Sequence, residues 1–464
     1  MVLSKVAPGA ILALSFALGL VPATIDRADA ADRTVIRIGA VVDQTGGSTS
    51  PLFRAAVELA GKQMNEALDR SGSTTKFEIV YGDSKSIPPF AQSEALRLIN
   101  QDQVNAIVAD SSGVAVAINR LNYDANSPAK HKVAITCFQC SSGFIHDPNV
   151  TESDLQVQTA ERDLGHWLYR EFYVSNYEAA ALAQIALHRI NAGAGKAGEP
   201  LKIGIFADGG HRALASGFQP MLSHFYKQPS VTEITYFTSL DKLQPDWDKV
   251  VKPVDANGKP VSPPDLVIVT MLPEAAAAAI SAYHKAGYKI PILSNNSFRR
   301  NYILKKIAAE AEGLEGSSVM LVDKSASGAL FQTAFKKMTG ELPEMTSSGA
   351  YDSAVTLMLA ALVASKDANK TREVSPEDIR KALGEINVAS AKKIRPSVAD
   401  FSAAIKLIDK GKPINYEGAY SPNDWNSVGD IFPPLVHWKV ENGQFKEYEQ
   451  YDCGPTTAFC PRKG

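Results

Sequence analysis

The sequence has few cysteines and almost no net charge. Its 464 residues include 48 Lys and Arg against 50 Asp and Glu, a formal net charge of −2, and only 4 Cys. This balance removes the usual electrostatic reason to expect a nucleic-acid binder. With 45% hydrophobic and 21% charged residues, the composition is that of a globular protein. The length predicts two or three domains, because single hydrophobic cores rarely grow so large.

Motifs of the common enzyme classes are also lacking. The chain has no Gly-x-Ser-x-Gly nucleophile elbow, no Walker A loop and no His-Glu-x-x-His pair. The first predicted strand is followed by Asp43-Gln44-Thr45-Gly46-Gly47-Ser48, which is not a Gly-x-Gly-x-x-Gly dinucleotide loop. The eight His are scattered, without a nucleophile or metal partner nearby. We therefore expect no enzyme, no cofactor and no metal site.

The longest apolar segment lies at the N-terminus. Lys5 precedes an apolar stretch at 7–22, and Ala28-Asp29-Ala30 forms a small-x-small cleavage pattern. This arrangement is typical of a secretory signal peptide, and the stretch is shorter than the roughly 20 residues of a membrane span. The apolar run at 357–364 has only the length of a core helix. We expect a signal peptide over residues 1–30, cleaved near Ala30, and a soluble, exported mature protein.

The four cysteines form two close pairs. Cys137 and Cys140 are separated by two residues, and Cys453 and Cys460 by six. In an oxidising compartment the simplest pairing is local, within each pair. A redox-active Cys-x-x-Cys centre and a four-thiolate zinc site stay open as alternatives. We favour structural disulfides, because loop residues rather than a helix follow the first pair and the second pair lacks zinc-knuckle spacing.

Strand and helix patterns alternate along most of the chain. Apolar, β-branched runs predict strands at 35–42, 77–81, 106–109, 133–136, 202–207, 231–237, 266–271 and 290–294. Apolar residues at helical spacing predict helices at 51–68, 90–99, 114–121, 177–190, 213–225 and 273–286, and one that begins at Trp247. This alternation implies βαβ units and parallel sheets. We expect an α/β fold of two doubly wound domains, divided near residues 141–170. A third portion from about Leu314 mixes helices with a hairpin at 435–440 and 444–451.

Several segments together carry a family resemblance. In chain order they are IRIGAVVDQTGGSTSPLFRAAVELAGKQMNEA, VNAIVADSSGVAVAINRLNYDANSP, WLYREFYVSNYEAAALAQIAL, PDLVIVTMLPEAAAAAISAYHKAGYKIPILSNNSF, SSGAYDSAVTLMLAAL, and INYEGAYSPNDWNSVGDI with LVHWKVENGQF. They resemble periplasmic solute-binding proteins of the branched-chain amino-acid (Leu/Ile/Val) type, which serve ABC importers. The resemblance spans nearly the whole mature chain.

The resemblance implies a type I periplasmic binding protein with a Venus-flytrap architecture. Its two α/β lobes are joined by three hinge crossovers, which places lobe one at 32–168 plus 316–415 and lobe two at 169–315 plus 416–464. A small solute binds between the lobes, the hinge closes over it, and the closed state is presented to a membrane ABC permease. The family also implies a periplasmic monomer.

Two serine pairs are the first candidates for ligand contacts. Ser111 and Ser112 stand where a strand gives way to a helix, and a helix N-terminus offers unpaired N–H groups to a carboxylate. The family uses this loop for its ligand's carboxylate. It also uses the loop after the fourth strand, which here contains Ser141 and Ser142 beside Cys140. An ordinary helix-capping role for Ser111 is compatible with ligand contact.

Further candidates follow from the family pattern and its departures. His211 occupies the position of a family Tyr that contacts the ligand. The family's ammonium-binding acid has no clearly aligned counterpart, and Asp246 is our candidate. Thr45 belongs to the Thr-Gly loop after the first strand, while Met271 and Asn295 end strands of the second lobe. Because the ammonium partner is uncertain, a ligand that is an organic acid or amide stays open.

Two other functions stay open at this point. The chain can be a sensory or accessory binding subunit for a non-amino-acid organic acid or amide. It can also be a thiol oxidoreductase that uses Cys137 and Cys140.

The serine loop yields a direct test. Replacing Ser111 and Ser112 together by alanine is expected to weaken ligand binding by more than about tenfold, since hydrogen bonds to a charged group contribute about 1.5–3 kcal/mol each. Unchanged affinity in isothermal titration calorimetry would remove both serines from the site.

Overall fold

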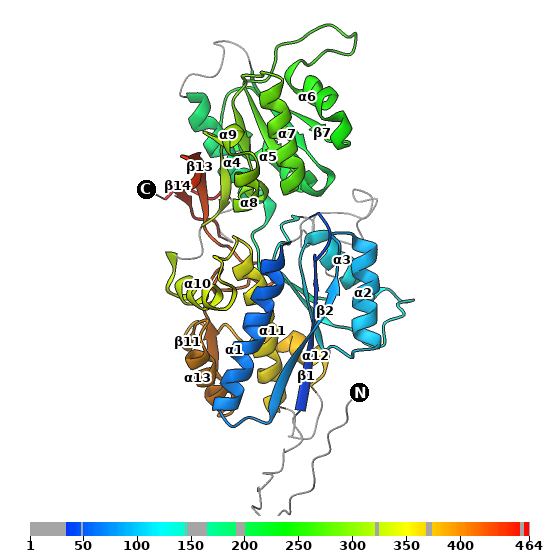
Figure 1. The fold of residues 1–464 in the computed structure, drawn as a ribbon, viewed down its shortest axis with the longest axis vertical. Coiled ribbons are helices and arrows are strands. Elements are labelled where there is room, and N and C mark those ends of the chain that lie inside the picture. Colours follow the sequence, from blue (N-terminus) through cyan, green and yellow to red (C-terminus); the bar gives the residue numbers. More distant parts are fainter. Residues whose placement is uncertain are drawn as a thin grey trace, which may run out of the picture.

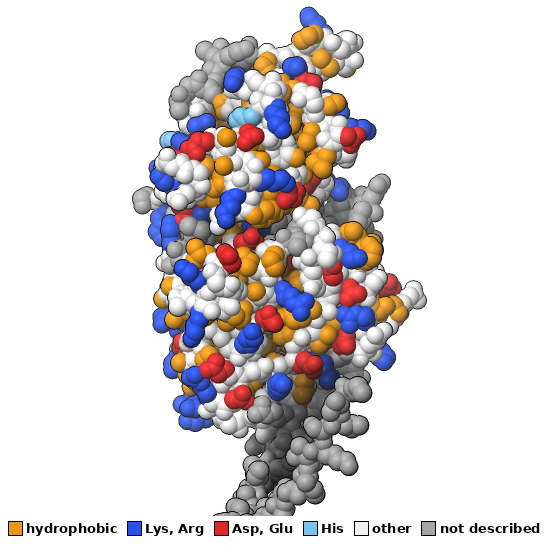
Figure 2. Space-filling model, viewed as in Figure 1, with side chains coloured by type: hydrophobic (Ala, Val, Ile, Leu, Met, Phe, Trp, Pro, Cys, Tyr) orange, Lys and Arg blue, Asp and Glu red, His pale blue; other side chains and the backbone are white. Residues whose placement is uncertain are grey.

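The computed structural model describes residues 34–47, 50–143, 145, 165–191, 200–320, 324–367, 374–454 and 459–463. The chain forms two α/β lobes stacked along the long axis of the molecule (Figure 1). The expected α/β class with parallel sheets is confirmed. On the face seen in Figure 2, acidic and basic side chains are interspersed over both lobes, which agrees with the near-zero net charge. The expected signal peptide lies outside the described residues.

The sheet of the first lobe is parallel throughout. Its strand order is β2-β1-β3-β4-β5, formed by β1 (Thr34–Val42), β2 (Thr75–Asp83), β3 (Ala106–Ala109), β4 (Ala134–Cys137) and β5 (Leu168–Arg170). Alternate residues of β1 face opposite sides: Ile38 and Ala40 pack in one core and Val41 in the other. Both faces of the sheet are therefore buried, as expected when helices cover a parallel sheet on both sides.

The two faces of this sheet are covered by different sets of helices. One core contains α2 (Pro88–Asn100) and α3 (Ser112–Tyr123). The other contains α1 (Pro51–Arg70) and α11 (Ser347–Asp367), which lie side by side in Figure 1, with α10 (Ala326–Thr339), α12 (Pro376–Leu383) and α13 (Val398–Ile408). The short strands β11 (Lys392–Ile394) and β12 (Ile414–Tyr416) pair beside α13. Much of the third portion of the sequence thus completes the first lobe.

The second lobe has a mixed sheet in the order β14-β13-β10-β9-β8-β6-β7. Its parallel part contains β6 (Leu201–Ala207), β7 (Ser230–Tyr236), β8 (Leu266–Thr270), β9 (Ile292–Ser294) and β10 (Glu315–Val319). The predicted hairpin forms β13 (Leu435–Glu441) and β14 (Gln444–Tyr451), and β13 pairs antiparallel with β10. Helices α4 (Ser175–Asn191) and α5 (Arg212–Phe225) contribute to one core, and α6 (Leu243–Val251), α7 (Pro273–Lys285), α8 (Asn301–Lys306) and α9 (Ala308–Ala311) to the other.

Three segments cross between the lobes. They run from β5 to α4, from β10 to α10, and from β12 to β13. The chain changes lobe slightly later than the sequence boundaries at 168/169 and 315/316. Strand β5 pairs with β4 as far as Arg170, and all of β10 pairs within the second sheet. β5 is only three residues long, and such a strand gives no pattern from which its end can be read.

One helix of the first lobe has the length and hydropathy of a membrane span. The stretch Ser347–Ser365 of α11 meets that test, but 89% of it is buried inside the protein. It packs against α1 and β4 at the centre of the first core. This burial identifies α11 as a core helix, as expected from the sequence.

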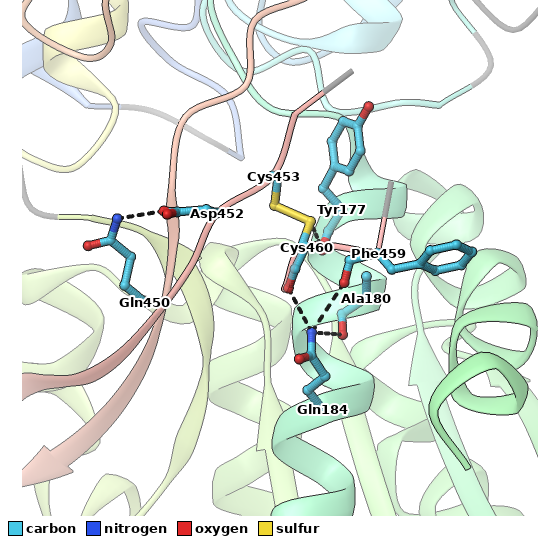
Figure 3. The surroundings of a disulfide bond; sticks show 8 residues. All are labelled: Tyr177, Ala180, Gln184, Gln450, Asp452, Cys453, Phe459 and Cys460. Atoms are coloured by element: carbon cyan, nitrogen blue, oxygen red, sulfur yellow. Dashed lines mark hydrogen bonds between the residues drawn. A yellow bond between two sulfur atoms is a disulfide. The ribbon is translucent and has the colours of Figure 1, made fainter. Parts of the chain in front are cut away.

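Both cysteine pairs form disulfides, Cys137 with Cys140 and Cys453 with Cys460. The second disulfide fixes the C-terminal segment against α4 (Figure 3). There Gln184 Nε2 donates to the carbonyl oxygen of Cys460 at 2.9 Å, and the Phe459 ring stacks on His224 at a centroid distance of 3.4 Å. The second disulfide therefore belongs to the architecture of lobe two.

A buried carboxylate on α11 holds the third crossover. Asp352 accepts hydrogen bonds from the Tyr416 hydroxyl at 2.6 Å and from the backbone N–H groups of Ala419 at 2.9 Å and Tyr420 at 2.7 Å. The side chain is fully buried, and burial raises its pKa to about 7 despite these donors. One side chain of the first lobe thus fixes the path by which the chain returns to the second.

Replacing Asp352 by alanine tests this anchor. The change leaves three donors without an acceptor in a buried place, so the free energy of unfolding should fall by about 3 kcal/mol. Urea titration measures the loss. Asp409→Ala, at an exposed position after α13, is the control and should change stability by less than about 0.5 kcal/mol. Equal stability of the two variants would contradict the anchor.

Candidate functional site

A small cavity of about 40 Å³ lies between the two lobes. Its lining comes from both lobes and consists of Ser50, Phe53, Gln139, Leu272, Pro273, Ser297, Arg300, Tyr302 and Glu344. Most of these residues follow the carboxyl ends of β1, β4, β8 and β9. Open α/β sheets bind ligands at this edge.

The start of α1 forms one wall of the cavity. Ser50 caps the helix, its Oγ accepting from the Leu52 N–H at 3.3 Å. One turn on, the Phe53 ring meets Phe138 edge to face, with centroids 5.3 Å apart. Next to Phe138, Gln139 donates from Nε2 to Thr346 Oγ1 at 2.8 Å. The first-lobe wall thus combines an aromatic face with polar groups that already have local partners.

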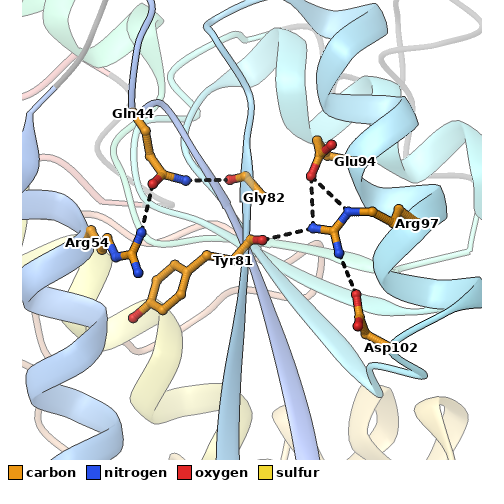
Figure 4. Close-up of polar contacts among 7 residues, drawn as sticks. All are labelled: Gln44, Arg54, Tyr81, Gly82, Glu94, Arg97 and Asp102. Atoms are coloured by element: carbon orange, nitrogen blue, oxygen red, sulfur yellow. Dashed lines mark hydrogen bonds and ion pairs between the residues drawn. The ribbon is translucent and has the colours of Figure 1, made fainter.

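Polar contacts at the edge of the first sheet hold the loop after β1 (Figure 4). Gln44 accepts from Arg54 Nη1 at 2.9 Å and donates to the carbonyl oxygen of Gly82 at 3.3 Å. The Arg54 guanidinium lies over the Tyr81 ring, 4.2 Å from its centroid. On the other side of β2, Arg97 donates to the Tyr81 carbonyl oxygen at 2.9 Å. These contacts connect the loop after β1 with β2, α1 and α2.

The first disulfide shapes the loop that carries Gln139. Cys137 and Cys140 are both fully buried. Arg170 Nη1 donates to the carbonyl oxygens of Cys140 at 3.1 Å and Ser142 at 2.8 Å, and Arg170 also pairs with Asp430 at 2.6 Å. Arg170 therefore binds the disulfide loop to the third crossover. A buried, bonded pair lacks the partial exposure typical of reactive cysteines, which favours a structural role.

In the second lobe, a short chain of polar contacts leads to Ser297. The Asp208 carboxylate pairs with His211 Nδ1 at 2.7 Å and accepts from the Leu272 N–H at 2.6 Å. His211 Nε2 lies 2.9 Å from Ser297 Oγ. Burial alone lowers the pKa of His211, but the neighbouring Asp208 raises it above the ordinary value. His211 thus lies one residue behind the cavity wall and orients Ser297.

The loop after β9 is held from inside the second lobe. Glu178 of α4 accepts from the Asn296 N–H at 2.8 Å, the Ser317 hydroxyl at 3.0 Å and the Tyr173 hydroxyl at 2.6 Å. Burial raises the pKa of Glu178 to about 7, although these donors and His211 oppose the shift. The loop that carries Ser297 and Arg300 is consequently held at Asn296 by Glu178, a side chain that does not line the cavity.

Two consecutive arginines in this loop, Arg299 and Arg300, differ in whether their guanidinium groups have partners. Arg299 pairs with Glu447 at 2.8 Å and donates to Ser318 Oγ and the Val319 carbonyl oxygen. Arg300 is only 7% exposed. Unlike Arg299, its Nη1 is buried without a hydrogen-bond partner among the described residues. Arg300 lines the cavity. A buried guanidinium with an unused donor requires an anionic or acceptor group, which a ligand can provide.

An acidic group lines the same cavity from the first lobe. Glu344 precedes α11, and its Oε2 is buried without a hydrogen-bond partner within the described residues. Tyr302, at the start of α8, lies close enough to both charges for its pKa to respond: burial raises it to about 12, Arg300 opposes the rise and Glu344 adds to it. The cavity is therefore lined by one group of each charge.

The residues predicted from the sequence do not line this cavity, but several lie directly behind it. His211 contacts Ser297, Met271 precedes Leu272 in the core, and Asn295 is fully buried beside Asn296. Ser112 Oγ accepts from the Ser142 N–H at 3.1 Å. The Ser141 carbonyl oxygen accepts from Ser175 at the start of α4.

Three other candidates have local partners. The half-buried Ser111 is hydrogen-bonded to Asp110. Thr45 is exposed and donates to Asp83 at 2.6 Å. Asp246 accepts from Thr238 and pairs with Lys249 on α6. Contact of the nine predicted residues with a ligand stays a prediction.

Sequence reasoning did not single out Arg300, Glu344, Ser50, Phe53, Gln139 or Tyr302. The available signal was the Arg299-Arg300 pair, which begins five residues after the end of a predicted strand and so lies near the carboxyl edge of the sheet. The sequence does not distinguish the paired arginine from the unpaired one.

Comparisons with known proteins agree with this architecture. Residues 35–146 match the family model described as "Periplasmic binding protein". The structure is similar to the leucine-binding protein LivK from Thermotoga maritima, with a TM-score of 0.61 and 15% identity over 89% of this chain and 98% of that one. The chain thus has the fold of a periplasmic binding protein. The resemblance inferred from the sequence is confirmed.

Other solved structures with this fold differ in the molecule they hold. LivJ from Streptococcus pneumoniae in complex with isoleucine has a TM-score of 0.60 and 15% identity, covering 89% of this chain and 98% of that one. A solute-binding protein of an ABC transporter from Rhodopseudomonas palustris, in complex with 3,4-dihydroxybenzoic acid, has a TM-score of 0.58 and 17% identity, covering 90% and 97%. The comparison with curated protein sequences finds no match.

Removing the first disulfide tests its role at the cavity. Replacing Cys137 and Cys140 by serine should lower the free energy of unfolding by about 2 kcal/mol, the loop-closure estimate for so short a loop. It should also speed amide hydrogen exchange over residues 138–143, because without the disulfide only the hydrogen bonds from Arg170 restrain this loop. Serines at Cys453 and Cys460 are the matched control and should leave that exchange unchanged. Unaltered exchange at 138–143 in the first variant would contradict the proposed role.

Proposed function

We propose that this chain is the periplasmic solute-binding component of an ABC importer and that it binds a small carboxylate-bearing solute between its lobes. The observation that carries the proposal is Arg300, a buried guanidinium with an unused donor on the wall of the inter-lobe cavity. Binding draws the lobes together about the three crossovers, and the closed form docks on a membrane permease. The N-terminal segment supports export to the periplasm.

The cavity geometry supports a role for both lobes in binding. The solute enters between the first-lobe wall of Ser50, Phe53 and Gln139 and the second-lobe wall of Ser297 and Arg300. A ligand that touches both walls binds the closed state better than the open one, which is the differential affinity that hinge closure requires. Two of the solved structures with this fold hold isoleucine and 3,4-dihydroxybenzoic acid, and both of these molecules carry a carboxylate.

A sensory binding subunit is the second candidate, and it would use the same cavity. It differs in its partner, a receptor instead of a permease. Loss of solute uptake on deletion of the gene supports the importer. Normal uptake with loss of an induced response supports the sensory subunit. The buried disulfide at Cys137 and Cys140 argues against a thiol oxidoreductase.

Arg300→Gln tests the proposed site. Natively purified protein is first analysed by mass spectrometry for a retained solute, and binding of that solute, leucine, isoleucine and 3,4-dihydroxybenzoate is measured by calorimetry. The substitution should weaken binding of a carboxylate about 10- to 150-fold, the equivalent of one charge-assisted hydrogen bond. Lys305→Gln is the control. It removes an exposed positive charge on α8, and the variant should bind the solute as the wild type does. Equal affinity of the two variants would refute the site.

A further inference from the structure

The hydroxyl group of Ser297 lies on the cavity wall and is hydrogen-bonded from behind by an ionisable side chain. His211 Nε2 lies 2.9 Å from Ser297 Oγ, so one of these two atoms donates a proton to the other. A serine hydroxyl has a single proton and two lone pairs. Which atom donates therefore decides what the hydroxyl can still offer to a group inside the cavity.

The other ring nitrogen of His211 has a fixed role. Its Nδ1 lies 2.7 Å from Asp208 Oδ1, and the same carboxylate accepts from the backbone N–H groups of His211 at 3.1 Å and Leu272 at 2.6 Å. Burial raises the pKa of Asp208, but His211 and the backbone donors outweigh burial and hold it below the ordinary value. An ionised carboxylate only accepts hydrogen bonds, so Nδ1 carries a proton whether the ring is neutral or charged.

The two protonation states of His211 then give opposite arrangements of Ser297. In the neutral ring Nε2 has only a lone pair, so the Ser297 hydroxyl donates to it and presents a lone pair to the cavity. In the protonated ring Nε2 donates to Ser297 Oγ instead, and the hydroxyl proton is free to turn toward the cavity. Asn295 Nδ2, at 3.5 Å, donates to the same oxygen and occupies its other lone pair.

We infer that His211 is a positioning residue whose protonation makes Ser297 a donor to an acceptor group of the solute, such as a carboxylate, and whose deprotonation withdraws that donor. This inference rests on the proposed function and adds its dependence on pH. Binding of a carboxylate at Ser297 is thus coupled to the uptake of a proton at His211. The affinity is highest while the ring is protonated and falls as the pH rises through the pKa of His211.

The charged groups around His211 favour the protonated ring. Burial lowers the pKa of His211, but Asp208 from its own loop and Glu178 from α4 raise it above the ordinary value. From the loop after β9 the ring is faced by the uncharged Ser297. Burial raises the pKa of Glu178 to about 7, so Glu178 loses its charge in the same pH range. A variant that keeps Glu178 but lacks the hydroxyl of Ser297 therefore separates the two groups.

The first test needs no solute. In protein with isotope-labelled histidine, proton–nitrogen NMR spectra report the tautomer and the titration of each ring, and the spectrum of His211→Gln assigns the signals of His211. We expect the neutral ring to carry its proton on Nδ1 and to have a pKa above the ordinary value of about 6.5. A neutral ring protonated on Nε2, or a pKa below the ordinary value, would overturn the inference.

The second test measures affinity against pH. Calorimetry with the natively retained solute, leucine, isoleucine and benzoate should show binding about tenfold or more tighter at about pH 5.5 than at about pH 8, with proton uptake seen in buffers of different ionisation enthalpy. In Ser297→Ala, which leaves Asp208 and His211 in place, the change should fall to about threefold or less. His284→Gln removes an exposed histidine of α7 and should keep the wild-type change.

The outcomes separate this inference from the proposed function. If a solute binds equally tightly at both pH values, or if the wild-type change persists in Ser297→Ala, the role of His211 is refuted and the carboxylate site at Arg300 stands. If none of these compounds binds at either pH, the inference and the proposed function fail together. Loss of the pH dependence in both Ser297→Ala and His211→Gln, with the proton of the neutral ring on Nδ1, supports both.

Discussion

A buried charged group is stable only with a partner of opposite charge or with hydrogen-bond donors or acceptors. This requirement explains most of the polar contacts at the boundary between the two lobes. Asp352 gathers three donors from the third crossover, Arg170 joins the disulfide loop to Asp430, and Glu178 holds the loop after β9. Glu171 meets the requirement differently, because burial beside Asp352 raises its pKa well above the ordinary value and favours the neutral form. Arg300 Nη1 and Glu344 Oε2 are buried without a hydrogen-bond partner among the described residues, and both side chains line the inter-lobe cavity.

The same contacts link the cavity to the hinge. Arg170 ends β5 at the first crossover, and it reaches both the loop that carries Gln139 and the crossover segment near Asp430. Glu178 lies on the first helix after that crossover and holds the backbone at Asn296, four residues before Arg300. The walls of the cavity are thus attached to the segments that cross between the lobes.

Much of the fold could be predicted from the sequence. Apolar periodicity located most strands and helices before residue 295 within a few residues, but not β5, and β13 and β14 followed from their Asn442-Gly443 turn. The candidate site was harder. A pattern places a residue at a strand's carboxyl edge, but whether its side chain lines the cavity or lies behind it depends on packing. His211 and Met271 lie at that edge, yet one supports Ser297 and the other belongs to the core.

The sequence by itself determined the alternating α/β architecture, the local cysteine pairs and the family resemblance, because these depend on short-range periodicity and spacing. Only the tertiary structure decided which of two adjacent arginines is free to bind. Arg299 meets Glu447, which lies 148 residues away in the chain, while Arg300 faces a cavity shared with Glu344. Such pairings are set by how two lobes pack, and no local pattern records them. The polarity of the site, a cation on one lobe and an anion on the other, is therefore a property of the folded chain alone.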